Sequence, residues 1–314
     1  MPVISFISLP MERVWGGRAL ETVYGRTLPE ASRPYGESWE IVDRADEQSV
    51  VAQGEYAGKT LHELWMEQRL TLFGEGLPAS ERFPLLVKIL DAQDDLSIQV
   101  HPPSHMADAL AGEPKTEMWY IAEAEADAKL YVGLRAGADR RSFEKAIELG
   151  TVADEVHEIA VHAGDSIFIP SGRLHAIGAG LLIFEIQQNS DTTYRVFDWN
   201  RLGLDGVARE LHVDESLASI DFFDIEPQLD VEVGKEGVIA MCEFFMVEKF
   251  TLAPRTTVGN TNSGRFSLLT IVEGKLEDAN GYRWGRGMTV LLTRGNEHLT
   301  AMESSVVLRT SIPR

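Results

Sequence analysis

The chain of 314 residues has very few of the features that anchor or cross-link a protein. Cys242 is its single cysteine, so no disulfide can form within the chain. No apolar run approaches the roughly 20 residues that cross a bilayer. The N-terminus also lacks the basic start and apolar core of a signal peptide. These absences predict a soluble protein of a reducing compartment, and we expect it in the cytoplasm.

Basic residues are scarce relative to acidic ones. The chain has 29 Lys and Arg against 49 Asp and Glu, a formal net charge of -20. Nucleic-acid backbones and anionic membranes are bound by clustered cations. We therefore expect neither as a partner. A small anionic ligand is compatible with this charge if a few Lys and Arg converge on it.

Short β-like runs dominate the remaining pattern, separated by Gly, Pro and Asp. Helical spacing is rarer. Many short strands with few helices predict an all-β sandwich or barrel. The predicted strands lie within residues 84–92, 96–102, 116–124, 129–134, 165–172 and 180–188, and the predicted helices within 60–74, 139–150 and, more weakly, 214–224.

Two segments resemble one another closely enough to suggest an internal repeat. Residues 164–175 read GDSIFIPSGRLH and residues 287–298 read GMTVLLTRGNEH. Each has Gly, a strand-like apolar run, a second Gly and a His at matching offsets. The repeat predicts two copies of one β-module. The acidic, proline-containing segment 224–237 is the natural boundary, which gives domains 1–230 and 231–314.

The segment LSIQVHP predicts a strand with two polar residues on one face. Gln99 and His101 are two positions apart, and side chains alternate between the faces of a strand. The segment KTEMWYI repeats this spacing with Lys115 and Glu117. Directed into a barrel, these side chains could begin a metal site. Taken singly, the first pair is better explained by a solvated strand face or a histidine satisfied by a core hydrogen bond, and the second by a weak surface ion pair.

A third segment supplies a further candidate ligand. In GDSIFIPSGRLHAIG, the spacing of Gly, Pro, Gly and His is typical of the second motif of the cupin barrel, and it predicts that His175 is directed into a barrel mouth. Nitrogen and oxygen donors of this kind suit zinc and other divalent metals. No thiolate takes part, which disfavours a structural zinc finger. The predicted ligands are Gln99, His101, Glu117 and His175.

The segment that follows, FEIQQNSDTTYRVFDWNR, is rich in charge. It holds Asp191, Arg195, Asp198 and Arg201 within residues 184–201. Loops on a rigid scaffold concentrate functional residues. A salt-bridged surface loop is the competing interpretation of this segment.

Together these segments resemble those of type I mannose-6-phosphate isomerases of the short bacterial form. The matching pieces run in the family's order over residues 1 to about 205, and the most specific are QVHP and KTEMW. The resemblance implies a fold dominated by β-structure, with two cupin-type jelly-roll modules. The resemblance also implies that the few helices belong to the N-terminal module. The C-terminal module is expected to bind no metal.

The resemblance also implies an activity and a site. The activity is the interconversion of D-mannose 6-phosphate and D-fructose 6-phosphate by proton transfer through an enediol or enediolate. One zinc ion per chain would bind the four predicted ligands, and Arg195 and Lys115 would be catalytic. The base is left open among Lys115, Glu185 and Asp191. The implied substrate-binding residues are Lys88, Glu37, Trp15, Glu185 and Asp191.

Three other interpretations use the same scaffold. A cupin oxygenase would bind iron and consume oxygen. A regulatory protein would bind a sugar phosphate without converting it, because fold alone does not fix function. A related isomerase would act on a different aldose.

Overall fold

The computed structural model describes residues 3–230, 234–260, 264–295 and 297–313. The chain divides into two compact units. The central unit comprises residues 10–37 and 90–233, and the terminal unit comprises residues 1–9, 38–89 and 234–314. Among the described residues, no helix is both long and apolar enough to cross a membrane.

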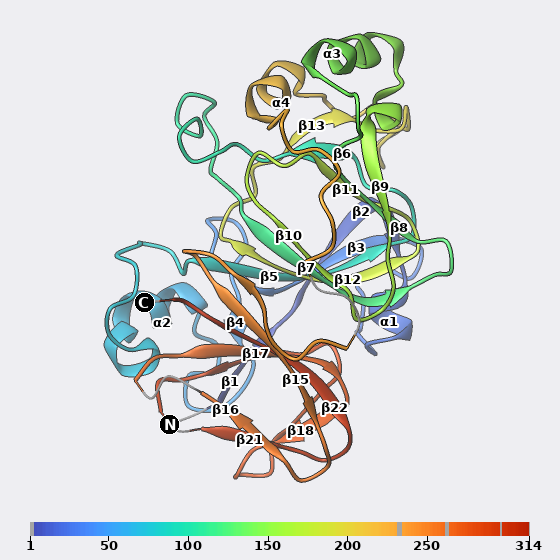
Figure 1. Cartoon of the computed structure of the whole chain (residues 1–314). Coiled ribbons are helices and arrows are strands. Elements are labelled where there is room, and N and C mark those ends of the chain that lie inside the picture. The colour runs from blue at the N-terminus through green and yellow to red at the C-terminus, as the bar shows by residue number, and fades with distance from the viewer. Residues whose placement is uncertain (1–2, 231–233, 261–263, 296, 314) are drawn as a thin grey trace. The chain divides into compact units, whose positions relative to one another are not determined.

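The strands of the central unit form a large and a small sheet (Figure 1). The large sheet has the order β10-β7-β12-β5-β2-β3, and the small sheet has the order β13-β6-β11-β8-β9. Strands β2, β3 and β5 also include residues of the terminal unit. The strands are β2 (Leu9–Gly17), β3 (Tyr35–Ile41), β5 (Leu85–Ala92), β6 (Ile98–Val100), β7 (Glu117–Ala124), β8 (Lys129–Leu134), β9 (Val156–Ala160), β10 (Ser166–Ile169), β11 (His175–Ile177), β12 (Leu181–Gln188) and β13 (Tyr194–Phe197).

The terminal unit also has two sheets. Their orders are β14-β15-β22-β17-β20-β1-β4 and β16-β21-β18-β19. The strands are β1 (Val3–Ile7), β4 (Val50–Val51), β14 (Gly237–Met241), β15 (Met246–Leu252), β16 (Thr257–Gly259), β17 (Ser267–Glu273), β18 (Lys275–Glu277), β19 (Arg283–Gly285), β20 (Thr289–Leu292), β21 (His298–Ala301) and β22 (Ser305–Ser311).

The strand orders reveal one jelly-roll arrangement used twice. The run β5-β12-β7-β10 recurs as β15-β22-β17-β20, and β6-β11-β8-β9 recurs as β16-β21-β18-β19. The two segments of the predicted repeat fold as β10–β11 and β20–β21. Gly164 and Gly287, which precede β10 and β20, both have positive φ, 99° and 82°. The predicted fold class, a β-rich chain with two jelly-roll modules and few helices, is confirmed.

The division of the chain differs from the expected split after residue 230. Strand β1 pairs with β20, with Val3 opposite Leu292, and β4 pairs with β1. Residues 1–9 and 38–89 therefore belong to the same unit as the C-terminal segment. Pairing between distant segments determines this grouping, and no local composition signal marks it.

The helices follow their sequence signals. In the terminal unit, α2 (Leu61–Glu67) begins with a capping box in which the Thr60 hydroxyl accepts from Glu63 N–H, and a π-turn, η1 (Arg69–Phe73), follows it. All of the helices lie within residues 1–230 of the described chain, the segment to which the sequence analysis assigned them. In the central unit, α3 (Arg140–Leu149) ends at Gly150, where φ is 70°. The remaining helices are α1 (Ala19–Thr22), η2 (Val152–Glu155) and α4 (Val213–Ser219), which covers only the start of its predicted range.

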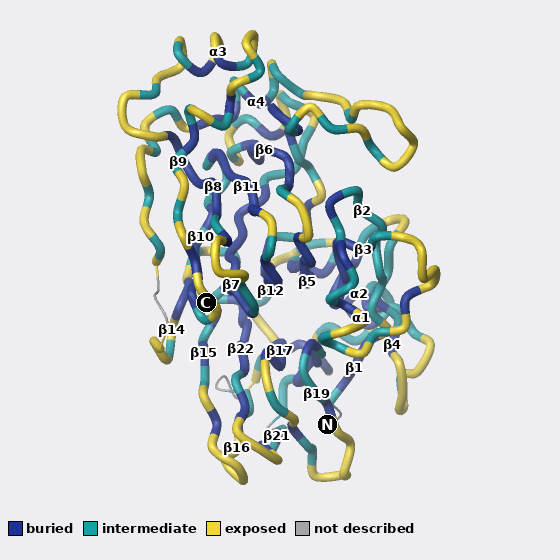
Figure 2. Tube along the Cα trace, turned by 90° about the vertical axis from the view of Figure 1, so that its right-hand side faces the viewer, coloured by how far each residue is buried: buried dark blue, intermediate teal, exposed yellow. Residues whose placement is uncertain are grey.

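The central unit has apolar clusters on both faces of its small sheet. Trp119, Val132 and Ile183 belong to the cluster between the two sheets. Tyr131 and Ala176 belong to the cluster on the other face, which includes residues of α3. Figure 2 shows β7, β8, β11 and β12 buried along most of their length. Polar side chains inside this barrel are therefore removed from water.

The turn before β11 depends on a glycine. Gly172 has a φ of 94°, and its N–H donates to the carbonyl of His101 at 2.9 Å. This hydrogen bond thus connects the segment that contains His101 with the segment that contains His175. A Cβ at this position would lie 3.3 Å from the carbonyl oxygen of Ser219.

We expect Gly172→Ala to lower the free energy of unfolding by about 1–3 kcal/mol, because an L-residue is strained at this φ. Urea denaturation followed by circular dichroism measures the change. Gly285→Ala is the matched control, since its φ is unstrained and nothing lies within 4 Å of its added Cβ. Equal stability of the two variants would show that the turn does not require glycine.

Candidate metal centre and active site

Three predicted ligands meet inside the central unit. His101 directly follows β6, Glu117 begins β7 and His175 begins β11. One potential ligand atom from each lies within 4.8 Å of the others. All three residues are 0% exposed. These residues could hold a metal ion.

Strand register explains how distant residues come to share one face. Across β11 and β6, His175 lies opposite Gln99, and across β13 and β6, Arg195 lies opposite Gln99. Residues directly opposite one another in antiparallel strands direct their side chains to the same face. Arg195, Gln99 and His175 therefore form one row, whereas the adjacent Val100 and Ala176 pack in the cluster on the other face.

Backbone carbonyls orient both imidazoles. Nδ1 of His101 lies 2.8 Å from the carbonyl oxygen of Thr192, and Nδ1 of His175 lies 2.9 Å from that of Arg173. A carbonyl oxygen only accepts, so Nδ1 carries the proton in each ring. Each Nε2 then presents a lone pair to the cluster. Metal-binding histidines are oriented in the same way by the partner of their second nitrogen.

The charges of the cluster also suit metal binding. Burial lowers the pKa of His175 to about 3 and also lowers the pKa of His101, so both rings are neutral near pH 7. Burial would raise the pKa of Glu117, but the Lys115 ammonium outweighs it and holds that pKa below its ordinary value. The cluster therefore contains one ionised carboxylate and two neutral imidazoles.

One buried atom shows directly that the donor set fits a cation. Among the described residues, Glu117 Oε1 has no hydrogen-bond partner, and it lies 3.6 Å from Nε2 of His175. Leaving a buried acceptor unsatisfied costs free energy. A metal ion bound by His101, Glu117 and His175 would satisfy this oxygen.

Gln99, the fourth predicted ligand, lies at the edge of the cluster. Its Nε2 is 3.3 Å from Nε2 of His175, and its Oε1 accepts from the Ser97 hydroxyl at 3.3 Å. Rotating the amide by 180° would exchange these atoms, and the Ser97 hydroxyl could then accept from the amide N–H. Gln99 can therefore offer its oxygen to the same ion, but its role as a ligand stays a prediction.

Lys115 lies within this cluster. Its ammonium donates to Glu117 Oε2, lies 3.2 Å from Nε2 of His101 and lies 3.7 Å from Glu185 Oε1. Burial would lower the pKa of Lys115, but the carboxylates of Glu117 and Glu185 outweigh it and raise the pKa.

Glu185 and Asp191, the other candidate bases, differ in their surroundings. Glu185 is buried on β12 and accepts from the Trp119 indole N–H at 2.9 Å. The Trp119 ring in turn contacts His175 edge-on, with 5.4 Å between ring centroids. Asp191 is exposed on the loop just before Thr192. Glu185 is thus the carboxylate more firmly held beside Lys115.

Arg195 lies at the end of the row on the small sheet. Its Nη1 donates to the carbonyl of Glu210 at 2.8 Å. Among the described residues, its buried Nε has no hydrogen-bond partner. Burial lowers the pKa of Arg195, and the positive charge of Arg209 adds to this effect. The guanidinium therefore keeps unused donor capacity on the face that it shares with Gln99.

The remaining predicted site residues have other surroundings. Trp15 is buried in the apolar cluster between the sheets of the central unit. Glu37 forms an ion pair with Arg13 at 2.9 Å. Lys88 belongs to the terminal unit, where its ammonium lies over the ring of Trp39 at 4.8 Å. Their roles in substrate binding stay predictions.

The terminal unit keeps only part of the ligand pattern. By strand register and repeat position, Gly259 corresponds to Gln99, Ser267 to Glu117 and His298 to His175. The position of His101 falls on residue 261, which lies outside the described residues. At the described positions, neither a carboxylate nor an amide accompanies His298.

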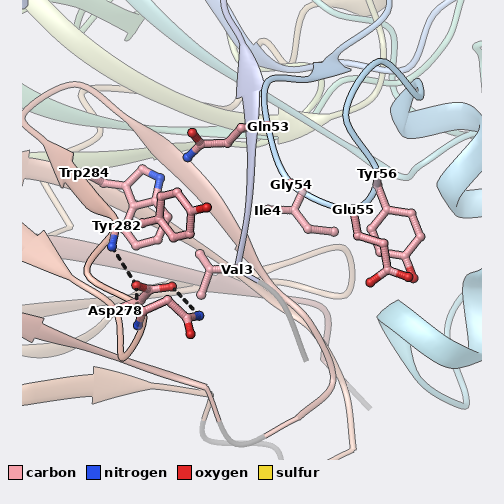
Figure 3. Close-up of a pocket in the computed structure, with 10 residues that line it drawn as sticks. Val3, Ile4, Gln53, Gly54, Glu55, Tyr56, Asp278, Tyr282 and Trp284 are labelled. Atoms are coloured by element: carbon pink, nitrogen blue, oxygen red, sulfur yellow. Dashed lines mark hydrogen bonds between the residues drawn. The ribbon is translucent and has the colours of Figure 1, made fainter.

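A hollow in the terminal unit has a different chemistry (Figure 3). Tyr56, Tyr282 and Trp284 contribute aromatic rings to its lining. The Asp278 carboxylate belongs to a turn, since its Oδ1 accepts from the N–H groups of Asn280 and Tyr282. None of the predicted site residues lines this hollow.

Several contributors to the site escaped the sequence analysis. Thr192 and Arg173 act through backbone carbonyls, which carry no residue signature. Trp119 was read only as part of a strand, although its position two residues after Glu117 gives it the same face. Arg209 and Glu210 lie beyond the segments that carry the resemblance, so nothing linked them to Arg195.

Comparisons with known proteins agree with this geometry. Residues 6–117 match the family model "Phosphomannose isomerase type I, catalytic domain". The chain is 38% identical over 294 residues to "Mannose-6-phosphate isomerase ManA" of Bacillus subtilis, covering 90% of each chain. The chain belongs to the type I phosphomannose isomerase family. Within this family it is also 42% identical over 269 residues to "Mannose-6-phosphate isomerase" of Streptococcus mutans, covering 84% of this chain and 83% of that one.

A solved structure from the family has the same fold. The crystal structure of the mannose 6-phosphate isomerase from Bacillus subtilis superposes with a TM-score of 0.85 at 30% identity. The alignment covers 99% of this chain and 100% of that one.

We expect His175→Ala to lose the bound metal, because it removes one of the two inward Nε2 lone pairs. His298→Ala should keep it, since His298 occupies the corresponding position in the repeat without the other ligands. Metal per chain, measured by plasma mass spectrometry on purified protein, checks both. Equal metal content in the two variants would contradict the assignment of the centre to the central unit.

Proposed function

We propose that this chain is a zinc-dependent mannose-6-phosphate isomerase with its active site inside the central unit. The observation that carries the proposal is the fully buried group of His101, Glu117 and His175 in direct contact with Lys115. Membership of the type I phosphomannose isomerase family supplies the reaction. The related proteins named above are described as mannose-6-phosphate isomerases.

The donor set supports zinc as the ion. Imidazole and carboxylate donors are common zinc ligands, and catalytic zinc sites keep a position open for water or substrate. His101, Glu117 and His175 would hold one zinc per chain, with the Gln99 amide as a fourth ligand. When bound, such an ion would act as a Lewis acid that polarises substrate oxygens.

The reaction moves protons within one sugar phosphate. A base removes the proton from C2 of the aldose, a proton is delivered to C1, and a hydroxyl proton passes between O2 and O1. Lys115 and Glu185 are the two groups we propose for these transfers, because both are buried and 3.7 Å separates Nζ from Oε1. The hydrogen bond from Trp119 would hold the Glu185 carboxylate in place during the transfer.

Arg195 would stabilise the negative charge that develops on the enediolate oxygens. A guanidinium stays protonated throughout, so it can offer fixed positive charge without exchanging a proton. The negative phosphate needs cations as well, and Arg201, six residues beyond Arg195 in the chain, is a candidate. A sugar phosphate is the single ligand class we propose. The cytoplasmic location expected from the sequence stays a prediction.

We expect chelation to abolish the conversion of mannose 6-phosphate to fructose 6-phosphate, and added zinc to restore it. Loss of the ion would remove several kcal/mol of transition-state stabilisation, a decrease of more than about 100-fold in rate. A coupled assay for fructose 6-phosphate measures this, with metal-free buffer as control. Full activity in protein shown to be metal-free would contradict the proposal.

For Arg195→Ala we expect kcat to fall by about 100- to 1,000-fold, the usual loss for a removed transition-state donor. Metal content and unfolding free energy should stay unchanged. Arg283→Ala serves as the matched control, because its exposed ion pair with Glu277 lies in the terminal unit. Wild-type turnover in Arg195→Ala would remove this arginine from the mechanism.

A further inference from the structure

A buried carboxylate joins two arginines close to Arg195. Asp198 is 6% exposed. Arg209 donates to both oxygens of the Asp198 carboxylate, with Nε 2.7 Å from Oδ2 and Nη2 2.5 Å from Oδ1. Arg201 donates to Oδ1 through Nε at 3.1 Å and Nη2 at 2.9 Å. The contact of Arg209 with both oxygens of the carboxylate fixes its guanidinium plane as well as its position.

The contact between Asp198 and Arg209 closes a hairpin whose ends lie at Arg195. Within the hairpin, Leu202 bridges to Ala208. Asp198 lies three residues after Arg195, and Arg209 lies one residue before Glu210. The ion pair therefore fastens the two chain segments immediately next to the catalytic candidate.

The same hairpin provides the direct partners of Arg195. The Glu210 carbonyl accepts from Arg195 Nη1 at 2.8 Å, and the His212 N–H donates to the Arg195 carbonyl at 2.7 Å. Burial lowers the pKa of the Arg195 guanidinium, and the nearby positive charge of Arg209 lowers it further. The Glu210 carbonyl accepts a hydrogen bond from this guanidinium and belongs to the residue that follows Arg209 in the chain.

We infer that Arg209, held by Asp198, is a positioning residue for Arg195: it fixes the Glu210 carbonyl that directs the Arg195 guanidinium to the reacting sugar. This inference rests on the proposed role of Arg195. Because Asp198 engages Arg209 through both Nε and Nη2, Arg209 acts through the hairpin and makes no substrate contact of its own.

The test is a double-mutant cycle on the intact, zinc-loaded protein, with kcat and KM measured for mannose 6-phosphate. Arg209→Ala should lower kcat by about 10- to 100-fold, the cost of misplacing a catalytic group by roughly 1 Å. Its KM should stay within about twofold of wild type. Adding Arg209→Ala to Arg195→Ala should cause no further loss, because the two residues act as one unit.

Two results would overturn the inference. A rise in KM with unchanged kcat in Arg209→Ala would identify a direct substrate contact. Equal fold-losses from Arg209→Ala with and without Arg195 would identify an effect independent of Arg195. Wild-type turnover in Arg195→Ala alone would instead reject the proposed role of Arg195. The positioning role of Arg209 and the catalytic role of Arg195 are therefore rejected by different results.

Two further variants distinguish a positioning role of Arg209 from a general loss of stability. Arg209→Lys keeps the charge but cannot make the two-edged contact, so its kcat should fall between those of wild type and Arg209→Ala. It also keeps the inference testable if Arg209→Ala does not fold. Glu144→Ala removes the exposed carboxylate that pairs with Arg140 at 3.0 Å and should change kcat by less than about twofold. Bound metal and unfolding free energy are measured for every variant.

Discussion

The register of three short strands is the constraint on which the site depends. Strands β13, β6 and β11 bring Arg195, Gln99 and His175 into one row, although 76 residues separate Gln99 from His175 along the chain. A slip of one residue would turn all three side chains to the opposite face of the sheet. The apolar residues between them prevent such a slip, because Val100 and Ala176 are required in the cluster on the other face. The hydrophobic core thus specifies the positions of polar groups that contribute little to it.

Burying those polar groups has an energetic cost that the surrounding backbone partly offsets. Two imidazoles, a carboxylate and an ammonium lie together with almost no access to water. The carbonyls of Thr192 and Arg173 satisfy the outward nitrogens, and Lys115 satisfies one oxygen of Glu117. Among the described residues, these contacts leave Glu117 Oε1 without a hydrogen-bond partner, and this oxygen lies 3.6 Å from Nε2 of His175. A cation bound there would satisfy the oxygen and could also accept the lone pairs of both imidazoles.

How much the sequence could predict depends on whether an interaction has a local signal. The strands and the capped helices α2 and α3 follow from alternation, capping residues and glycine stops, and the three clustered ligands follow from strand alternation together with the family resemblance. Pairing between distant segments has no such signal, which is why residues 1–9 and 38–89 were assigned to the other module. The carbonyls that orient the histidines could not be predicted either, because a backbone carbonyl also has no local sequence signal. Arg209 was missed because its partner, Asp198, is 11 residues away across a hairpin with no recognisable motif.

The two modules place different charges at corresponding positions of the same strand arrangement. Register and repeat position equate Arg309 in the terminal unit with Glu185 in the central unit. Arg309 is buried, pairs with Glu248 at 2.8 Å and donates to the Gly259 carbonyl at 2.7 Å. Its charge is thus neutralised within the protein, and its donors are engaged by neighbouring strands. In the central unit the corresponding carboxylate faces Lys115 beside two histidines whose lone pairs point inward. Corresponding strand positions thus hold an arginine engaged by neighbouring strands in the terminal unit and a carboxylate beside a lysine and two histidines in the central unit.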